Sequence, residues 1–452
     1  MSIKFDWEVE AEREHIPSAG EDPQAKRRRR RSQLRLLIVI LGAALLIGGM
    51  IAAVGVRLRY VDWEVENQLR DTIAAEVASL RLGDRESFLD VQRSADEAWI
   101  QQQSALFDRI QEAKITQDVA LTGRVLEVSV DDPRGRARVE EISGGAAYVR
   151  TWFYWLYEDG WRHVPPDYTF WGSPQTIERP GLTVRYRDFD APFAPVLAEA
   201  AAGWWMQGCA LLGCEGLPNV TIEIVPDEML RAGWSPADQW TLQVPSPFVR
   251  PARLDTPFDP ALQVEVAQLL AGRLVDAVHG GEVLAKGSDA AYLRDALTNW
   301  LVGRWLGADT GTLLMTSFAA RAGDAAVAAV ARAITPESSI SVVGDVVGAP
   351  LESLDLDWRD YLQQRLALED SLIAAGDQTG VQALYDLNDS TAQGLALARL
   401  GVPAPLESPR VLAASPAVDA AGAPILRAQV QRGETIEEIV FRLTQGTWKR
   451  TN

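Results

Sequence analysis

Ala261-Leu-Gln-Val-Glu-Val-Ala-Gln-Leu-Leu-Ala-Gly272 is the stretch that decides the fold of this chain. Its apolar residues recur at intervals of three and four, which predicts an amphipathic helix. A second helix is predicted over Tyr292-Leu-Arg-Asp-Ala-Leu-Thr-Asn-Trp-Leu-Val-Gly303. The two helices are expected to pair in a hydrophobic core. The residues expected to bury the first helix are Val264, Leu269, Leu270, Leu274 and Val275.

The segments around this helix pair predict a domain over residues 179–366 in which strands come first and helices later. That order indicates an α+β arrangement. An edge-type strand is expected at Leu242 to Pro245, just before a proline-rich connector. The other expected strands are Leu182 to Tyr186 and Val220 to Val225. The expected helices are Ala191 to Trp205, Pro260 to Val278, Ala290 to Trp305, Leu313 to Arg321, Ala325 to Ile334 and Leu356 to Leu366.

This arrangement resembles the catalytic core of gluzincin metallopeptidases, as found in peptidase MA-like proteins. Those enzymes carry H-E-x-x-H on one helix and a third, carboxylate ligand on the next. The resemblance places Val264 and Gln268 at the two histidine positions and Glu265 at the position of the general base. It places Asp295 at the ligand carboxylate and Asn299 at a second carboxylate position.

A zinc peptidase needs imidazole ligands and an open coordination position. Valine cannot ligate a metal, and a glutamine amide is a poor ligand for zinc. Beyond residue 57 the only histidines are His163 and His279, and neither stands in a metal-binding pattern. We therefore expect no metal, no cofactor and no peptidase activity, so the resemblance is to a pseudopeptidase.

Two alternatives to the pseudopeptidase remain open. One is a hydrolase that uses the carboxylates Glu265, Asp295 or Asp276, since paired carboxylates can catalyse hydrolysis. The other is a purely structural envelope protein without a ligand cleft. The chain contains no G-x-S-x-G elbow, no phosphate-binding loop and no G-x-G-x-x-G after a predicted strand.

Residues 36–56 carry no charge and predict a transmembrane helix. At about 1.5 Å per residue they can cross a hydrocarbon core of about 30 Å. Six consecutive basic residues, Lys26 to Arg31, precede them, whereas only Arg57 and Arg59 follow closely. The positive-inside rule predicts a signal anchor with residues 1–35 as a disordered cytoplasmic tail and the remainder extracytoplasmic. A cleaved signal peptide is the alternative.

The net charge of the chain narrows the class of possible partners, and its two cysteines allow a disulfide. The chain after residue 35 holds 35 basic and 55 acidic side chains, a net charge of about −20. This excess of acidic side chains argues against a nucleic-acid partner.

Cys209 and Cys214 are the only cysteines. In an exported domain they could close a small disulfide loop, and two buried free thiols are the alternative.

Residues 57–178 predict helices followed by a meander of strands. The helical patterns cover Val61 to about Ile115, and turn signals follow at Asp131-Asp-Pro-Arg-Gly135, Gly144-Gly145 and Asp159-Gly160. The expected strands are Gln117 to Val130, Ala137 to Ile142, Ala146 to Tyr157 and Gly160 to Val164. Helices before a meander that ends in Tyr157-Glu-Asp-Gly-Trp-Arg-His163 resemble the nuclear transport factor 2-like, or cystatin-like cone, fold.

Residues 367–452 repeat this pattern, and we expect a second domain of the same fold. A helical run around Gly376-Asp377 matches the one around Gly83-Asp84. Strands are expected at Ile425 to Val430 and Thr435 to Leu443. The closing Gln445-Gly-Thr-Trp-Lys-Arg450 resembles Asp159-Gly-Trp-Arg-His163 with one residue inserted. The pattern indicates duplicated domains and not a solenoid, and chance similarity of two hairpins is the alternative.

Taken together, the sequence predicts an α+β multidomain protein of bacterial type with one transmembrane helix. Two cone-like α+β domains are expected to flank a gluzincin-like α+β domain at the outer face of the cell membrane. The expected function is non-catalytic: the protein would bind a peptide or an envelope protein, or act as a scaffold at the membrane surface.

Overall fold

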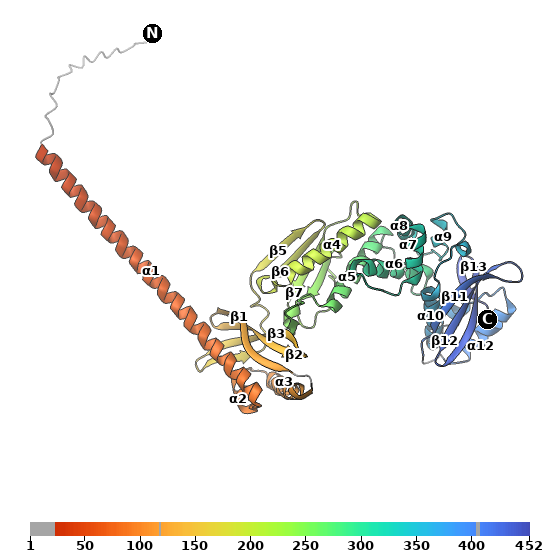
Figure 1. Ribbon diagram of the computed structural model, residues 1–452, viewed down its shortest axis with the longest axis horizontal. Coiled ribbons are helices and arrows are strands. Elements are labelled where there is room, and N and C mark those ends of the chain that lie inside the picture. Colours follow the sequence, from red (N-terminus) through yellow and green to blue (C-terminus); the bar gives the residue numbers. More distant parts are fainter. Residues whose placement is uncertain (1–22, 117–118, 404–406) are drawn as a thin grey trace, which may run out of the picture. The chain divides into compact units, whose positions relative to one another are not determined.

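The computed structural model describes residues 23–116, 119–403 and 407–452 (Figure 1). These residues form a mixed α+β structure with twelve α-helices and three β-sheets. The chain divides into two compact units, one up to Ala74 and one from Ala75 to Asn452. The first unit holds most of helix α1 (Pro23–Leu82), and all three sheets lie in the second.

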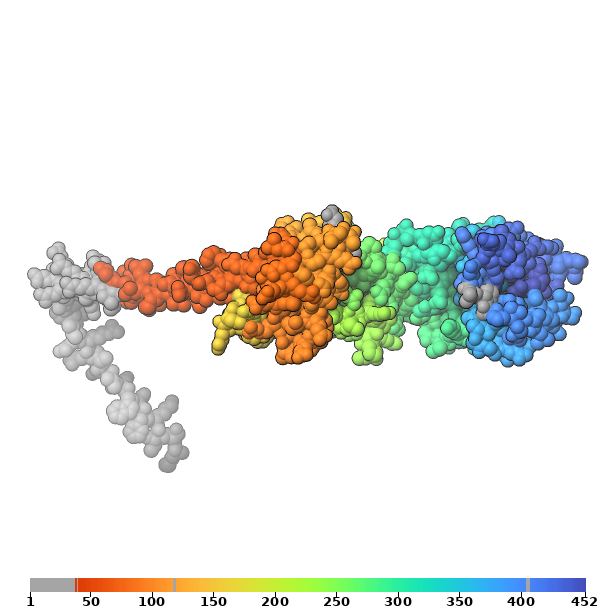
Figure 2. Space-filling model, turned by 90° about the horizontal axis from the view of Figure 1, so that it is seen from below, coloured from red at the N-terminus to blue at the C-terminus, as the bar shows by residue number. Residues whose placement is uncertain are grey.

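Within the described residues, α1 is the one helix that is long and apolar enough to cross a membrane. A signal sequence near the N-terminus can meet the same criteria of length and apolar composition. The leucine and isoleucine side chains between Leu37 and Leu58 are exposed (Figure 2, red). The helix begins at Pro23, so residues 23–35, which were expected to be disordered, are helical. Proline suits a first helical turn, and the Ala, Gln, Lys and Arg residues that follow are good helix formers. Residues 1–22 of the expected tail lie outside the described residues.

The first sheet of the second unit is an antiparallel meander, as the turn signals predicted. Short helix α2 (Arg85–Val91) begins at the cap Asp84, whose carboxylate accepts a hydrogen bond from the Ser87 N–H. Helix α3 (Glu97–Thr116) follows. The strands are β1 (Ala120–Asp131), β2 (Arg134–Ser143), β3 (Ala146–Tyr157) and β4 (Gly160–Val164).

The second sheet has the strand order β5-β6-β7-β9-β8, in which β6, β7 and β9 run parallel to one another. Its strands are β5 (Pro174–Arg179), β6 (Leu182–Arg187), β7 (Val220–Val225), β8 (Gly233–Trp234) and β9 (Thr241–Pro245). Leu242 to Pro245 is therefore the last strand but one, and the two-residue β8 forms the edge. A further short strand, β10 (Ala252–Arg253), pairs with β3 and joins the first sheet to this part of the chain.

Helices pack against the second sheet and against one another around a continuous core. Helix α4 (Ala194–Leu212) connects β6 to β7 and contacts α5 (Pro260–Val278), which pairs with α6 (Asp289–Leu306) (Figure 1). Alanines and Gly208 on α4 permit this close packing. The remaining helices of this part are α7 (Leu313–Ala322), α8 (Asp324–Ala333) and the single turn α9 (Val342–Asp345).

The C-terminal part again places helices before a four-stranded antiparallel meander. Its helices are α10 (Arg359–Ala375), α11 (Gln378–Ala383) and α12 (Ser390–Leu400). Its strands are β11 (Arg410–Val418), β12 (Pro424–Arg432), β13 (Thr435–Thr444) and β14 (Thr447–Arg450). The expected domain limits at residues 178 and 366 fall inside the β5–β6 hairpin and inside α10, and the hydrophobic core runs across both.

The two meanders share details beyond their element order. In each meander a buried glutamate forms a hydrogen bond with a residue sixteen positions later, Glu76 with Gln92 and Glu369 with Tyr385. That later residue also forms a β-bridge to the last strand. The bridging partners in the last strands are His163 and Arg450. In each last strand a buried tryptophan pairs with a leucine, Trp161 with Leu156 and Trp448 with Leu443. These matches extend the repeat predicted from Gly83-Asp84 and Gly376-Asp377.

Candidate functional site

Helix α5 presents one face to the core and the other to an open cleft. Its start is set by Asp259, whose carboxylate accepts a hydrogen bond from the Ala261 N–H at 2.8 Å, and by Pro260 in the first turn. The face packed into the core consists of Val266, Ala267, Leu270, Ala271, Leu274 and Val275. Glu265 and Gln268 lie on the exposed face.

The prediction that Val264 is a core residue is wrong, because its side chain is 40% exposed. Val266 and Ala267, which were not among the expected core residues, are fully buried instead. Apolar spacing alone could not distinguish the faces, since apolar residues occur on three sides of this helix.

Four of the five positions singled out by the resemblance line one cleft between α5 and α6. This cleft has a volume of about 430 Å³, and Glu265 and Gln268 face it from α5 while Asp295 and Asn299 face it from α6. Val264, at the first histidine position, does not line it. The described residues contain no group of three or more His, Cys, Asp or Glu side chains able to hold a metal ion.

An arginine that sequence reasoning did not single out dominates the chemistry of this cleft. The Arg294 guanidinium donates two hydrogen bonds to Asp276, at 2.8 Å and 2.9 Å, and a third to Asp295 at 2.9 Å. Burial alone would raise the pKa of the Asp276 carboxyl, but the hydrogen bonds and charge of Arg294, with a smaller contribution from His279, hold that pKa below its ordinary value.

The pairing with Arg294 limits what the carboxylates can do. A carboxyl with a lowered pKa is ionised at neutral pH and has no proton to give a leaving group. Asp276 and Asp295 both form ion pairs with the Arg294 guanidinium, and Glu265 is left as the single cleft carboxylate without an ion pair among the described residues. The hydrogen bonds that Arg294 donates to Asp276, and with a smaller effect to Asp295, raise the pKa of Arg294, which keeps its positive charge.

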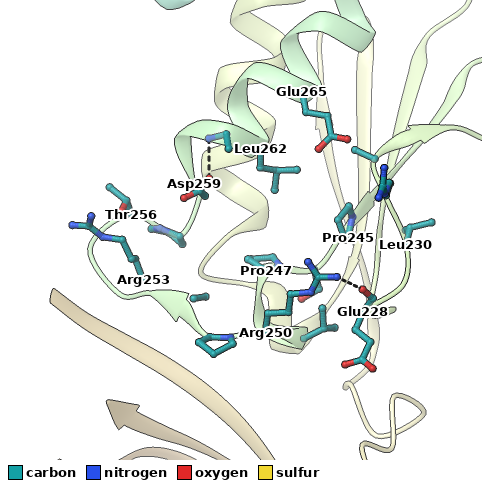
Figure 3. A pocket seen from close by; sticks show the side chains of 18 of the residues that line it. Glu228, Leu230, Pro245, Pro247, Arg250, Arg253, Thr256, Asp259, Leu262 and Glu265 are labelled. Carbon is teal, nitrogen blue, oxygen red and sulfur yellow. Dashed lines mark hydrogen bonds between the residues drawn. The ribbon is translucent and has the colours of Figure 1, made fainter. Parts of the chain in front are cut away.

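A second, larger pocket adjoins this cleft at Glu265, which lines both. It has a volume of about 560 Å³ and lies between the N-terminal turn of α5, the β7–β8 loop and the segment after β9 (Figure 3). Leu230, Pro245, Pro247 and Leu262 form apolar walls. The Glu265 side chain extends from α5 toward Leu230 and Pro245 (Figure 3). The two pockets together make one groove along α5.

The sequence predicted a proline-rich connector here but not a pocket. The prolines matter because they lack an N–H donor, so their backbone can form a wall without unsatisfied donors. Charged groups surround these walls. Arg250 donates a hydrogen bond to the Glu228 carbonyl, and Arg253 pairs with Asp255 at 2.7 Å.

Neither His163, His279 nor the two cysteines line this groove, although His279 contacts the lining residue Asp276. His279 follows the last residue of α5, and its Nε2 lies 3.3 Å from Asp276 Oδ1. His163 lies in β4 and its Nδ1 is 2.7 Å from Glu76 Oε1. Cys209 and Cys214 form a disulfide at the end of α4, with their Cα atoms 5.0 Å apart, and are not free thiols.

Comparisons of this chain with protein-family models, with curated proteins and with solved structures give no match. The resemblances to gluzincin and nuclear transport factor 2-like proteins therefore stay predictions from the sequence.

Proposed function

We propose that this chain is a single-pass membrane protein whose extracytoplasmic groove binds an extended segment of a peptide or protein without cleaving it. The apolar part of α1 would be the anchor, and the basic residues before it favour a cytoplasmic N-terminus. Binding would occur in the groove between α5, α6 and the edge of the second sheet. The cell membrane is the location that this topology implies.

The observation that carries the proposal is the groove itself. Two pockets of about 560 Å³ and 430 Å³ meet at Glu265, and valine and glutamine occupy the two histidine positions. A space filled by side chains would favour a purely structural role, whereas open pockets with apolar walls and a polar rim favour a ligand. Arg294 engages two of the three carboxylates of the hydrolase alternative, which leaves no acid–base pair.

An extended chain suits this groove for a reason of backbone chemistry. Strand β8 pairs with β9 only through Gly233 and Trp234, and no further strand covers it among the described residues. An exposed sheet edge offers backbone donors and acceptors to an added strand, and adjacent pockets accept alternate side chains. The apolar wall formed by Leu230 and Leu262 lies in the neighbouring pocket.

The test is peptide binding by the full-length protein in detergent micelles. A fluorescently labelled library of random ten-residue peptides would be screened by binding to immobilised protein, and the selected peptides titrated by fluorescence anisotropy. Leu262→Asp removes an apolar side chain from the groove wall, and burying a leucine contributes about 1.5–3 kcal/mol. We expect this variant to lose roughly tenfold or more in affinity.

The control is Val283→Asp, because Val283 is 92% exposed and does not line the groove. This variant should bind the selected peptides as the unaltered protein does. Equal loss in both variants, or selected peptides that are cut during the titration, would contradict the proposal.

A further inference from the structure

A further cavity of about 390 Å³ lies beside helix α3 and strands β3 and β4, and it adjoins the peptide groove at the segment around Arg250. Trp99 from α3, Trp152 from β3 and His163 from β4 are among the side chains that line it. The peptide groove includes none of these three. What this cavity could bind follows from how His163 is held.

His163 is fixed by a buried hydrogen-bond network centred on Glu76, which has no solvent exposure. Glu76 Oε1 lies 2.7 Å from His163 Nδ1 and accepts a bond from Gln92 Nε2 at 2.9 Å, and Glu76 Oε2 accepts one from the Tyr154 hydroxyl at 2.8 Å. A carboxylate at Nδ1 makes this nitrogen the proton donor and leaves Nε2 as the free position of the ring.

The Nε2 atom of His163 forms no hydrogen bond with the described residues. It is not fully buried either, because the fully buried side-chain atoms without a partner do not include it. Because the imidazole lines the cavity, this nitrogen is open to it. Two indole rings flank the imidazole, with centroids 5.6 Å away for Trp99 and 5.4 Å for Trp152. These rings give a flat ligand an apolar surface on which to stack.

The C-terminal meander shows what the same network is like without a free position. There the buried glutamate is Glu369, and Arg450 in the last strand donates to both of its oxygens at 3.2 Å. The Tyr385 hydroxyl donates to the same carboxylate at 2.9 Å. The arginine at that position donates its hydrogen bonds to the glutamate. His163 in the first meander bonds to its glutamate through Nδ1 alone, so its Nε2 is available to another partner.

Cationic side chains also line the cavity. Arg109 and Arg250 make no ion pair within the described part of the chain, and Arg150 is paired with Glu141 at 2.9 Å. Glu228 is the one acidic side chain among the lining residues. Two uncompensated guanidinium groups are notable in a chain with a formal net charge of −18, and guanidinium groups bind carboxylates well.

We propose that this cavity binds a small aromatic hydroxycarboxylate. The ring stacks on Trp99 and Trp152, the hydroxyl donates a hydrogen bond to His163 Nε2, and the carboxylate is bound by Arg109 and Arg250. The site shares Arg250 with the wall of the peptide groove, whereas Trp99, Trp152, His163 and Arg109 do not line that groove, so variants of these four residues test this site separately.

The test is isothermal titration calorimetry of the full-length protein in micelles with 2-, 3- and 4-hydroxybenzoate, corrected for titration into empty micelles. Benzoate lacks the hydroxyl and hydroxybenzyl alcohols lack the carboxylate, so both should bind at least about tenfold more weakly than the best hydroxybenzoate. His163→Gln and Arg109→Ala should each weaken that hydroxybenzoate by a similar factor.

Two matched variants serve as controls. His279→Gln alters the other histidine of the second unit, and Arg124→Ala alters an exposed arginine of the same meander; both should bind like the unaltered protein. Arg109 is exposed, so its replacement tests the site even if His163→Gln does not fold. The proposal is overturned if no hydroxybenzoate binds, if benzoate binds equally well, or if Arg109→Ala has no effect.

Discussion

Replacing Asp190 by Asn should remove a pH-dependent loss of stability. Asp190 has no solvent exposure, and its carboxylate accepts hydrogen bonds from the Trp171 indole at 2.8 Å and from the Ser246 hydroxyl. Burial raises the pKa of the Asp190 carboxyl from 3.8 to about 6, although these hydrogen bonds and the charges of Arg138 and Arg136 oppose the rise.

The sign and size of the effect follow from linkage. Between pH 4 and 6 the folded protein binds the Asp190 proton more tightly than the unfolded chain does. Stability from this group is therefore fully present below about pH 4 and is lost as the pH rises through about 6. A shift of roughly two units corresponds to about 3 kcal/mol.

The assay compares the full-length protein with Asp190→Asn by urea unfolding, followed by tryptophan fluorescence at pH 4.5 and pH 7.5. Many other groups titrate in this range, but the difference between the two proteins isolates Asp190. The stability of the variant relative to the unaltered protein should increase by about 2 kcal/mol between these two pH values, because part of the full effect is already lost at pH 4.5. Asp188→Asn, an exposed neighbour, is the matched control. A difference that is independent of pH, or that decreases toward pH 7.5, would refute this reasoning.

Two further predictions concern helix α4. Replacing Cys209 and Cys214 by Ser should lower the free energy of unfolding by about 2 kcal/mol, as expected for opening so short a loop, when unfolding is measured in urea without reductant. Gly208→Ala should lower the melting temperature, because its methyl group would collide with Leu274 and overpacking costs about 1–3 kcal/mol. Gly203→Ala on the same helix meets no atom within 4 Å and should leave the melting temperature unchanged or raise it.

Much of the secondary structure followed from local signals. The hairpins of the first meander were predicted because glycine and proline mark their turns. Strands β5 and β11 were missed because each contains a proline, Pro174 or Pro416, which counts against a central strand. Both strands lie at sheet edges, where a proline is tolerated. Strand β8 was missed because two residues carry no periodic pattern.

The candidate sites were less accessible to sequence reasoning. Of the five positions that the family resemblance singled out, Glu265, Gln268, Asp295 and Asn299 line one cleft and Val264 does not. The pairing of Arg294 with Asp276 was not anticipated, because eighteen residues separate the two and the relative register of α5 and α6 decides which side chains meet. The network of Glu76 and His163 joins residues that are 87 positions apart, a distance at which no local pattern operates.

Metal content and hydrolysis, measured on the same purified full-length protein, test the central claim of a metal-free, non-catalytic groove most directly. Zinc would be quantified by elemental analysis after dialysis, and peptides that bind the groove would be incubated with the protein and followed by mass spectrometry. The account predicts far less than one zinc per chain and intact peptides. One zinc per chain, together with peptide cleavage that a chelator abolishes, would contradict it.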